Sequence, residues 1–181
     1  MVTRAAQDWK GDEMFEKGDL ILYETAGVCR IEEISRLEFL KNDRVYYSLV
    51  PVFEKDSVIY VPVDNEKVKM RPIMTREEAE AFIEQLPGIE GRRDIGEKEK
   101  AQVYKQILLS GNHRELAAMI KGIFEVGQVR KGKGNRLAVR DEENMKRAQK
   151  LLYGELAAAL GMHPDQMPAY IGERLERPAV I

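Results

Sequence analysis

The pattern of apolar and polar positions divides the chain into a β-rich first part and a helical second part. Short apolar runs with strand character occupy residues 20–23, 28–34, 45–52 and 57–63, and Gly-, Asn- and Asp-containing turns separate them. Short strands spaced about ten residues apart are typical of a small antiparallel barrel or bent sheet. We therefore expect a β-unit over residues 14–73.

Beyond this unit the apolar positions recur at helical spacing. Thr75 and Glu78 have the spacing of a capping box, which predicts a helix that ends at Pro87-Gly88. Further helices are expected at residues 98–109, 112–127 and 141–161, with a short last helix after Pro164. The sequence thus predicts an α+β fold in which a β-unit precedes a bundle of four or five helices.

Four consecutive segments follow from these patterns. They are a flexible leader (1–13), the β-domain (14–73), a connecting helix and hinge (74–96) and a helical domain (97–181). The hinge is expected in the Gly-punctuated stretch 89–96. The single tryptophan, Trp9, lies in the leader and is either an anchor for a partner or a loosely packed terminal residue.

Charge is distributed unevenly along the chain, although the formal net charge is only −2. Residues 1–73 carry 11 Lys and Arg against 14 Asp and Glu, whereas residues 96–150 carry 13 against 7. A basic surface suits an anionic partner, with nucleic acid first; the alternative is a solvated helical surface with surplus lysine. We assign contacts with the DNA backbone to Arg92, Arg93, Lys121, Arg130, Lys131, Lys133, Arg136, Arg140 and Lys146. Without a recognition-helix pattern, these residues are expected to contact phosphates and not to read bases.

No residue pattern indicates a catalytic, metal or cofactor site. Cys29 lies in a predicted strand with no His nearby and is interpreted as a buried structural thiol. His113 and His163 follow helix-boundary signals and are interpreted as surface or capping residues. The sequence also lacks the run of about 20 apolar residues that a membrane span needs. We therefore expect a cytoplasmic protein that is not an enzyme, uses no cofactor and does not bind membranes.

The order of several short motifs resembles the CarD family of bacterial transcription regulators. In the first part the matching positions are Phe15, Gly18-Asp19, Tyr23, Gly27-Val28, Tyr46-Tyr47, Val61-Pro62-Val63 and Arg71. In the helical part they are Ser110-Gly111-Asn112, Met119-Ile120-Lys121, Asp141 and the stretch Ala148-x-x-x-Leu152-Tyr153-x-Glu155-Leu156. The resemblance extends over residues 14–175.

This resemblance implies a Tudor-like (SH3-like) β-barrel that docks on the β subunit of RNA polymerase, as a similar domain does in the transcription-repair coupling factor. It also implies that the helices lie against promoter DNA at the upstream edge of the melted region and alter open-complex stability. On this chain the polymerase-binding residues would be Arg36, Ser57, Val58, Ile59, Tyr60 and Val61, at a strand edge open to strand addition.

Two positions depart from the family pattern. Several members place a minor-groove Trp near the start of the helical domain, but residues 95–100 contain no aromatic side chain. Tyr60 stands before Val61-Pro62, where the family has an Arg, which indicates a more apolar polymerase contact. The expected function is a monomeric transcription regulator that bridges RNA polymerase and promoter DNA. The alternative is a polymerase-docked adaptor that recruits another protein without binding DNA.

Overall fold

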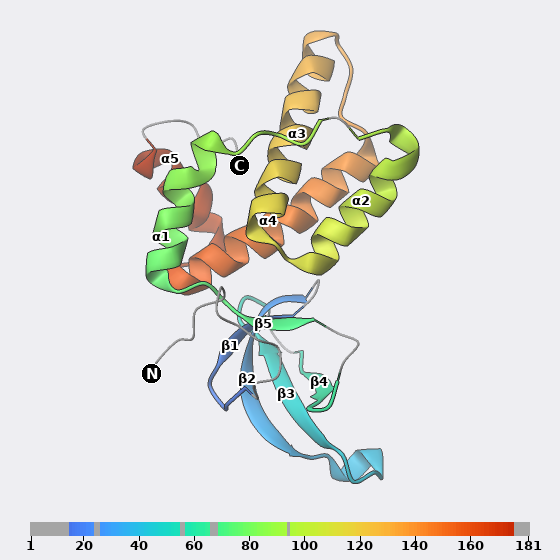
Figure 1. Cartoon of the computed structure of the whole chain (residues 1–181), viewed down its shortest axis with the longest axis vertical. Coiled ribbons are helices and arrows are strands. Elements are labelled where there is room, and N and C mark those ends of the chain that lie inside the picture. Colours follow the sequence, from blue (N-terminus) through green and yellow to red (C-terminus); the bar gives the residue numbers. More distant parts are fainter. Residues whose placement is uncertain (1–14, 24–25, 55–56, 66–68, 94, 176–181) are drawn as a thin grey trace.

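The computed structural model describes residues 15–23, 26–54, 57–65, 69–93 and 95–175 (Figure 1). The predicted leader, with Trp9, lies outside these residues. An antiparallel sheet occupies one end of the long axis and the helices occupy the other. The predicted α+β class is therefore confirmed.

The strands are β1 (Leu20–Tyr23), β2 (Gly27–Arg36), β3 (Val45–Pro51), β4 (Ile59–Pro62) and β5 (Met70–Pro72). They are ordered β4-β3-β2-β1-β5 in one antiparallel sheet. The first four correspond to the predicted apolar runs. The short β5 has no alternation of its own, and it is a strand because it pairs with β1.

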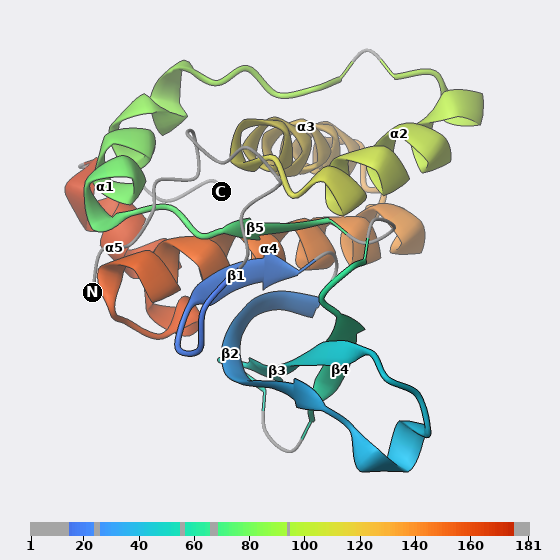
Figure 2. The same ribbon diagram turned by 60° about the horizontal axis from the view of Figure 1, so that its bottom comes forward.

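Strand β2 bends the sheet strongly (Figure 2). Its pairing with β3 shifts between Ile31 and Glu33, and an irregularity of this kind increases local bend and twist. The ladder nevertheless stays open, since β4 and β5 remain its two edges. An open, bent sheet is compatible with the predicted small barrel, but the barrel is not closed.

The helices are α1 (Arg76–Gln85), α2 (Glu97–Ser110), α3 (His113–Gly132), α4 (Val139–Leu160) and α5 (Met167–Arg174). The described residues also contain the 3-10 turns η2 (Glu38–Leu40), η3 (Leu86–Gly88) and η4 (Pro164–Gln166). Thr75 and Glu78 form both halves of the predicted capping box. Gly161 ends α4 in the left-handed region, at a φ of 72°, as expected for a glycine C-cap.

Two helix boundaries differ from the prediction. Helix α3 continues to Gly132, because the isolated Gly127 costs a helix only about 1 kcal/mol and does not end it. Helix α4 begins at Val139, so Asp141 lies in its first turn and is not its N-cap. The Asp141 carboxylate is buried and accepts a 2.7 Å bond from Lys100 on α2.

Helix α4 lies between the sheet and α3 (Figure 2). One apolar face of α4 is buried in the helical core, with Met145 partly buried beside it, and it comprises Ala148, Leu151, Leu152, Leu156 and Leu160. Leu22, Val28 and Ile73 on one face of the sheet pack toward Ala158 of α4. The helices of the described segments include none with the length and apolarity that a membrane span requires.

The other face of the sheet has a small core of its own, formed by Phe15, Ile21, Cys29, Ile31, Tyr47, Leu49 and Val61. Successive residues of a strand point to opposite faces, so Val28 and Cys29 belong to different cores. Burial raises the pKa of the Cys29 thiol to about 11. Cys29 is therefore the buried structural thiol that the sequence indicated.

Candidate functional surfaces

Strand β4 is an edge that no other described strand covers. The Val63 amide donates to the Val45 carbonyl at 2.9 Å, and hydrogen-bonded pairs of an antiparallel ladder recur at every second residue. With the observed register, Val61 and Ile59 bond to β3 in the same way. Tyr60 therefore directs its backbone N–H and C=O away from the sheet.

Pro62 is consistent with this alternation. It pairs with Tyr46 at a position that makes no ladder bond, where a proline removes no donor from the sheet. Its carbonyl accepts a 3.0 Å bond from the Asn65 amide. The backbone groups available to an added strand thus centre on Tyr60. We call residues 57–62 the docking edge.

The opposite edge of the sheet, β5, is occupied by the helical part. The Arg71 guanidinium donates to both carboxylate oxygens of Glu155 on α4, at 2.5 and 2.8 Å, and to the Gly111 carbonyl at 2.7 Å. Glu155 is fully buried and also accepts from the Met74 amide at 3.1 Å. A bidentate pair of this kind defines the orientation of both partners. The buried pair joins β5 to the helices and leaves β4 as the open edge.

The structure brings the predicted polymerase-binding residues to one side of the sheet. Ser57 and Val58 precede β4 and are exposed, and Tyr60 is 43% exposed. Arg36 is exposed at the end of β2, opposite Val45 on β3. Ile59 is half-buried and Val61 is buried in the sheet core. The side chains of Ile59 and Val61 therefore pack toward the sheet core and do not form part of the exposed surface at the edge.

Phe39 lies beside this edge and was missed by the sequence-based prediction. It belongs to η2, in the connection between β2 and β3, and is 63% exposed. Its ring meets that of Tyr60 edge to face, with centroids 5.4 Å apart. The available signal was the apolar pair Phe39-Leu40 in an otherwise polar turn. Leu40 and Val45, close to Phe39 in the sequence, and Val58, close to Tyr60, are further large apolar side chains that are exposed.

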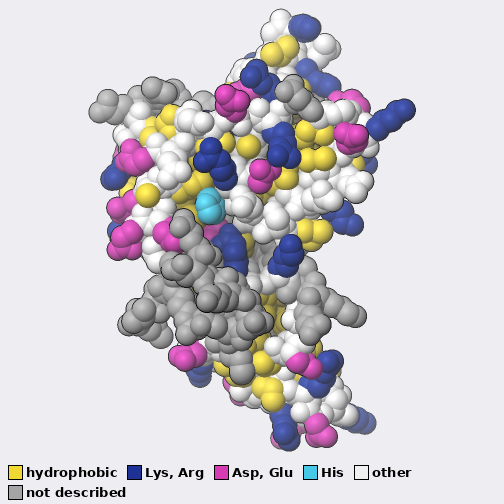
Figure 3. Space-filling view, in the orientation of Figure 1, with side chains coloured by type: hydrophobic (Ala, Val, Ile, Leu, Met, Phe, Trp, Pro, Cys, Tyr) yellow, Lys and Arg dark blue, Asp and Glu magenta, His cyan; other side chains and the backbone are white. Residues whose placement is uncertain are grey.

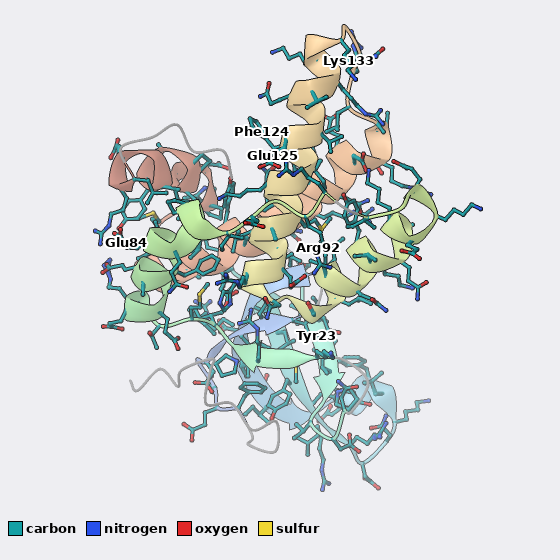
Figure 4. All side chains as sticks on the ribbon, turned by 45° about the horizontal axis from the view of Figure 1, so that its top comes forward. Tyr23, Glu84, Arg92, Phe124, Glu125 and Lys133 are labelled. Carbon is teal, nitrogen blue, oxygen red and sulfur yellow. The ribbon has the colours of Figure 1, made fainter. Side chains whose placement is uncertain are left out.

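Five of the predicted DNA-binding residues lie where α3 ends and α4 begins, and we call them the basic tip: Arg130, Lys131, Lys133, Arg136 and Arg140. All but the half-buried Arg130 are exposed. Within the described part of the chain none of the five has an acidic partner. The tip projects at the end of the molecule remote from the sheet (Figure 1), with Lys133 at its extremity (Figure 4) and Lys and Arg side chains around it (Figure 3). Its charges are therefore available to an anion.

The two predicted arginines of the connecting segment are paired with acids on α3. Arg92 contacts Glu115 at 2.8 Å, and Arg93 Nε lies 3.0 Å from Glu125 Oε2. The second contact has the distance of an ion pair but not the alignment of a hydrogen bond. Glu125 Oε2 is therefore buried without a hydrogen-bond partner among the described residues. Figure 4 shows Arg92 and Glu125 at separate positions, both apart from Lys133 at the tip. Both arginines are thus partly neutralised.

The stretch predicted as a hinge is bound closely to α3. The Arg92 amide donates to the Ala118 carbonyl at 2.8 Å, and the connection passes across α3 in Figure 2. A Cβ at Gly122 would lie 2.2 Å from the Arg92 carbonyl oxygen, so only glycine permits this approach. We call residues 89–93 the strap. Its contacts with α3 argue against a hinge at Arg92.

The remaining two predicted DNA-binding residues are also engaged within the protein. Lys121 donates from Nζ to the carbonyl oxygens of Leu86 and of Ile89, the latter at 2.9 Å. Burial lowers the pKa of Lys121. Lys146 pairs with Glu142 one helical turn away at 2.9 Å. Lys121 therefore supports η3 and the strap, and Lys146 is a partly compensated surface charge.

A pocket of about 460 Å³ lies in the crease between the sheet and the α4–η4 corner. Phe53 and Tyr153 line it, and Lys150 forms an ion pair with Glu54 across the crease. His163 also lines it and caps η4, accepting from the Asp165 amide at 3.4 Å, in the capping role predicted for it. The second histidine, His113, is half-buried and packs against Phe82 elsewhere in the helical part.

The described residues thus form a sheet with an open edge at β4, and a buried ion pair joins this sheet to helices whose basic tip has no acidic partner among those residues. Residues 15–74 match the family model of the CarD-like/TRCF RID domain. Residues 15–74 are accordingly a CarD-like domain, a type of domain that interacts with RNA polymerase. No curated protein matches the chain. The family model ends before α1, so it leaves the helical part without an assigned role.

Proposed function

We propose that this protein docks on the β subunit of RNA polymerase through its docking edge and contacts promoter DNA through its basic tip. By adding contacts to one intermediate, it alters the stability of the open complex. The proposed function is non-enzymatic and uses no cofactor. The observation that carries it is the coexistence of an open strand edge in a polymerase-interacting domain with five cations, at the other end of the molecule, that have no acidic partner among the described residues.

Docking by strand addition is supported by the state of the β4 edge. An exposed edge strand offers unpaired N–H and C=O groups to another chain, and recognition by strand addition uses these groups for affinity. Tyr60 presents both groups outward, and the opposite edge is occupied by Arg71 and the helices. The edge at β4 is therefore the one suited to a polymerase strand.

Contact with DNA is supported by the difference between the tip and the other predicted cations. Arg92, Arg93 and Lys146 have acidic partners, and Lys121 binds carbonyl groups, whereas the tip residues have no acidic partner in the segments that the structure describes. Flexible cations contact phosphates without reading the sequence, and their affinity falls steeply with salt. The tip thus suits the DNA backbone near a promoter that the polymerase has already selected.

Bridging requires that both surfaces be reached at once. The docking edge and the basic tip lie toward opposite ends of the long axis (Figure 1), and the Arg71–Glu155 pair connects the two parts. A coupling free energy of about 1–3 kcal/mol between two such contacts changes an equilibrium by roughly 5–150-fold. This is the range expected for the effect on open-complex stability.

The test is the lifetime of promoter open complexes with and without the full-length protein. The variant Lys131→Glu/Lys133→Glu should lose most of the effect, because it reverses two tip charges. The matched control is Lys98→Glu/Lys105→Glu, which changes the net charge equally at exposed positions of α2 and should behave like the wild type.

Equal lifetimes for the tip variant, the control and the wild type would refute the DNA contact. If the protein still bound polymerase but had no DNA affinity, the adaptor function, in which the helices recruit another protein, would replace it. Failure of the wild-type protein to bind the β subunit at moderate salt would refute the docking itself.

A further inference from the structure

We infer that Phe39 and Tyr60 form a recognition site for one apolar side chain of the polymerase strand that adds to the docking edge. The inference rests on the proposed docking at β4. It adds to that proposal the residues that select the partner strand and the chemistry of the side chain that they accept.

The two rings form an exposed aromatic surface beside the outward N–H and C=O groups of Tyr60, which no described strand pairs with. Phe39 is 63% exposed and Tyr60 is 43% exposed, and their rings meet at an interplanar angle of 66°. Large aromatic side chains at the centre of an interface are the residues whose truncation most often weakens binding. Because Tyr60 belongs to the open edge itself, any strand that pairs there must pass next to this surface.

The loop that carries Phe39 is held in place by contacts of the residues that follow Phe39. Asn42 donates from Nδ2 to the Tyr46 hydroxyl at 3.1 Å and accepts from the Arg44 amide at 3.0 Å. The Arg44 guanidinium in turn contacts Asp64, just beyond β4, at 2.9 Å. The loop is thereby tied to β3 and to the end of β4. A site held before binding loses less conformational entropy when the partner arrives.

The ladder geometry defines which residue of the partner meets the two rings. Because Tyr60 directs its N–H and C=O outward, an added antiparallel strand would place one residue directly across from it in a hydrogen-bonded pair. The side chains of such a pair lie on the same face of the sheet, so the partner's side chain would lie beside the ring of Tyr60.

The chemistry of this position favours an aliphatic or aromatic partner residue. Val58, two residues before Tyr60 on the same face, is 50% exposed, and Pro62, two residues after it, also has no charge. A carboxylate placed there would lose hydration without gaining a partner from the two rings or from Val58. The proposed site therefore selects a strand with an apolar residue at this point.

The first experiment compares the affinity of full-length variants for core RNA polymerase. Phe39→Ala should bind at least about tenfold more weakly, as expected for loss of an aromatic anchor. The control Val139→Ala, which truncates a 72% exposed apolar residue at the start of α4, should bind like the wild type. Thermal unfolding of both variants should match the wild type, since neither side chain is in the core.

A second variant separates this inference from the docking proposal. Tyr60→Pro removes the outward N–H that an added strand would use, at a position that contributes no ladder bond to β3. Weak binding by Tyr60→Pro together with unchanged binding by Phe39→Ala would overturn the inference and leave docking intact. No binding by the wild type would overturn the docking proposal, and with it the basis of the inference.

The identity of the partner segment is tested by a photoreactive phenylalanine analogue at position 39. After irradiation with core polymerase, the cross-linked peptide should come from an extended segment of the β subunit that contains an aliphatic or aromatic residue. A cross-link to a helix, or to a segment with only charged and polar side chains, would overturn the inference.

Discussion

The docking edge and the basic tip are both exposed, but their side chains are held in different ways. At the edge, Tyr60 is held in register by β3, and Phe39 lies on a loop tied by Asn42 and Arg44. At the tip, the side chains of Lys131, in the last turn of α3, and Lys133, its C-cap, have no partners among the described residues. An ordered surface can select a particular partner by shape and register. An array of free cations supplies affinity for any phosphate backbone.

The two surfaces also depend on the rest of the fold to different degrees. The docking edge belongs to a sheet whose other edge strand, β5, is joined to the helices by Arg71 and Glu155. The basic tip lies where α3, which continues past Gly127, meets the start of α4. We therefore expect polymerase recognition to depend on tertiary packing more than nonspecific DNA affinity does.

The largest expected effect comes from breaking the connection between the two surfaces. Glu155→Ala should destabilise the protein by about 3–5 kcal/mol, because it leaves the Arg71 guanidinium without its buried partner. Chemical denaturation of the full chain measures this change.

The control for this variant is Arg174→Ala, which removes an exposed ion pair with Glu84 and should leave the free energy of unfolding unchanged. Equal effects of the two substitutions would show that the Arg71–Glu155 pair does not hold the parts together.

A smaller loss of stability is expected from Gly122→Ala. The new methyl group would meet the Arg92 carbonyl at 2.2 Å, so the strap must move away from α3. Overpacking of this kind costs about 1–3 kcal/mol.

Gly132→Ala, in the same helix, is the matched control because a Cβ there meets nothing within 4 Å. It should be neutral or stabilise the helix by up to about 1 kcal/mol. If Gly122→Ala behaved like this control, the strap would be mobile, and Arg92 would be free to join the basic tip as the sequence suggested.

Substitutions in the basic tip should change the affinity for DNA and leave the stability of the fold unchanged. Lys131→Gln/Lys133→Gln should reduce the slope of log affinity for duplex DNA against log salt by about 1.8, if each lysine neutralises one phosphate. Polymerase binding should stay unchanged. An unaltered slope, measured by fluorescence anisotropy over a range of salt concentrations, would remove the tip from the DNA interface.

The smallest expected effect is a pH dependence near the junction of the two parts. Burial lowers the pKa of His113, an effect that the nearby Glu155 carboxylate opposes. The unfolded chain therefore binds a proton at higher pH than the folded protein does, so stability should fall as the pH drops below about 6.5. His113→Asn should flatten this dependence in denaturation experiments at pH 7.5 and 5.5. A steeper fall in the variant would contradict the assignment.

Local features of the chain were predictable because their causes lie within a few residues. Alternation located β1 to β4, the Thr75–Glu78 spacing located the start of α1, and Gly161 located the end of α4. The order of the motifs from Phe15 to Arg71 indicated the CarD-like domain that the family match established. For these features the sequence alone was sufficient.

Which charges are free, and which edge is open, depended on contacts between residues far apart in the chain. Lys121 and Arg92 looked like parts of a basic surface, but the strap carbonyls hold the first and Glu115 pairs with the second. Conversely, Phe39 is an ordinary apolar residue in the sequence, and only the folded β2–β3 loop brings its ring to Tyr60. The sequence by itself determined most of the elements, the caps of α1 and α4 and the CarD-like domain. The tertiary structure decided which side chains remain available to a partner, because burial and ion pairing depend on packing that no local pattern contains.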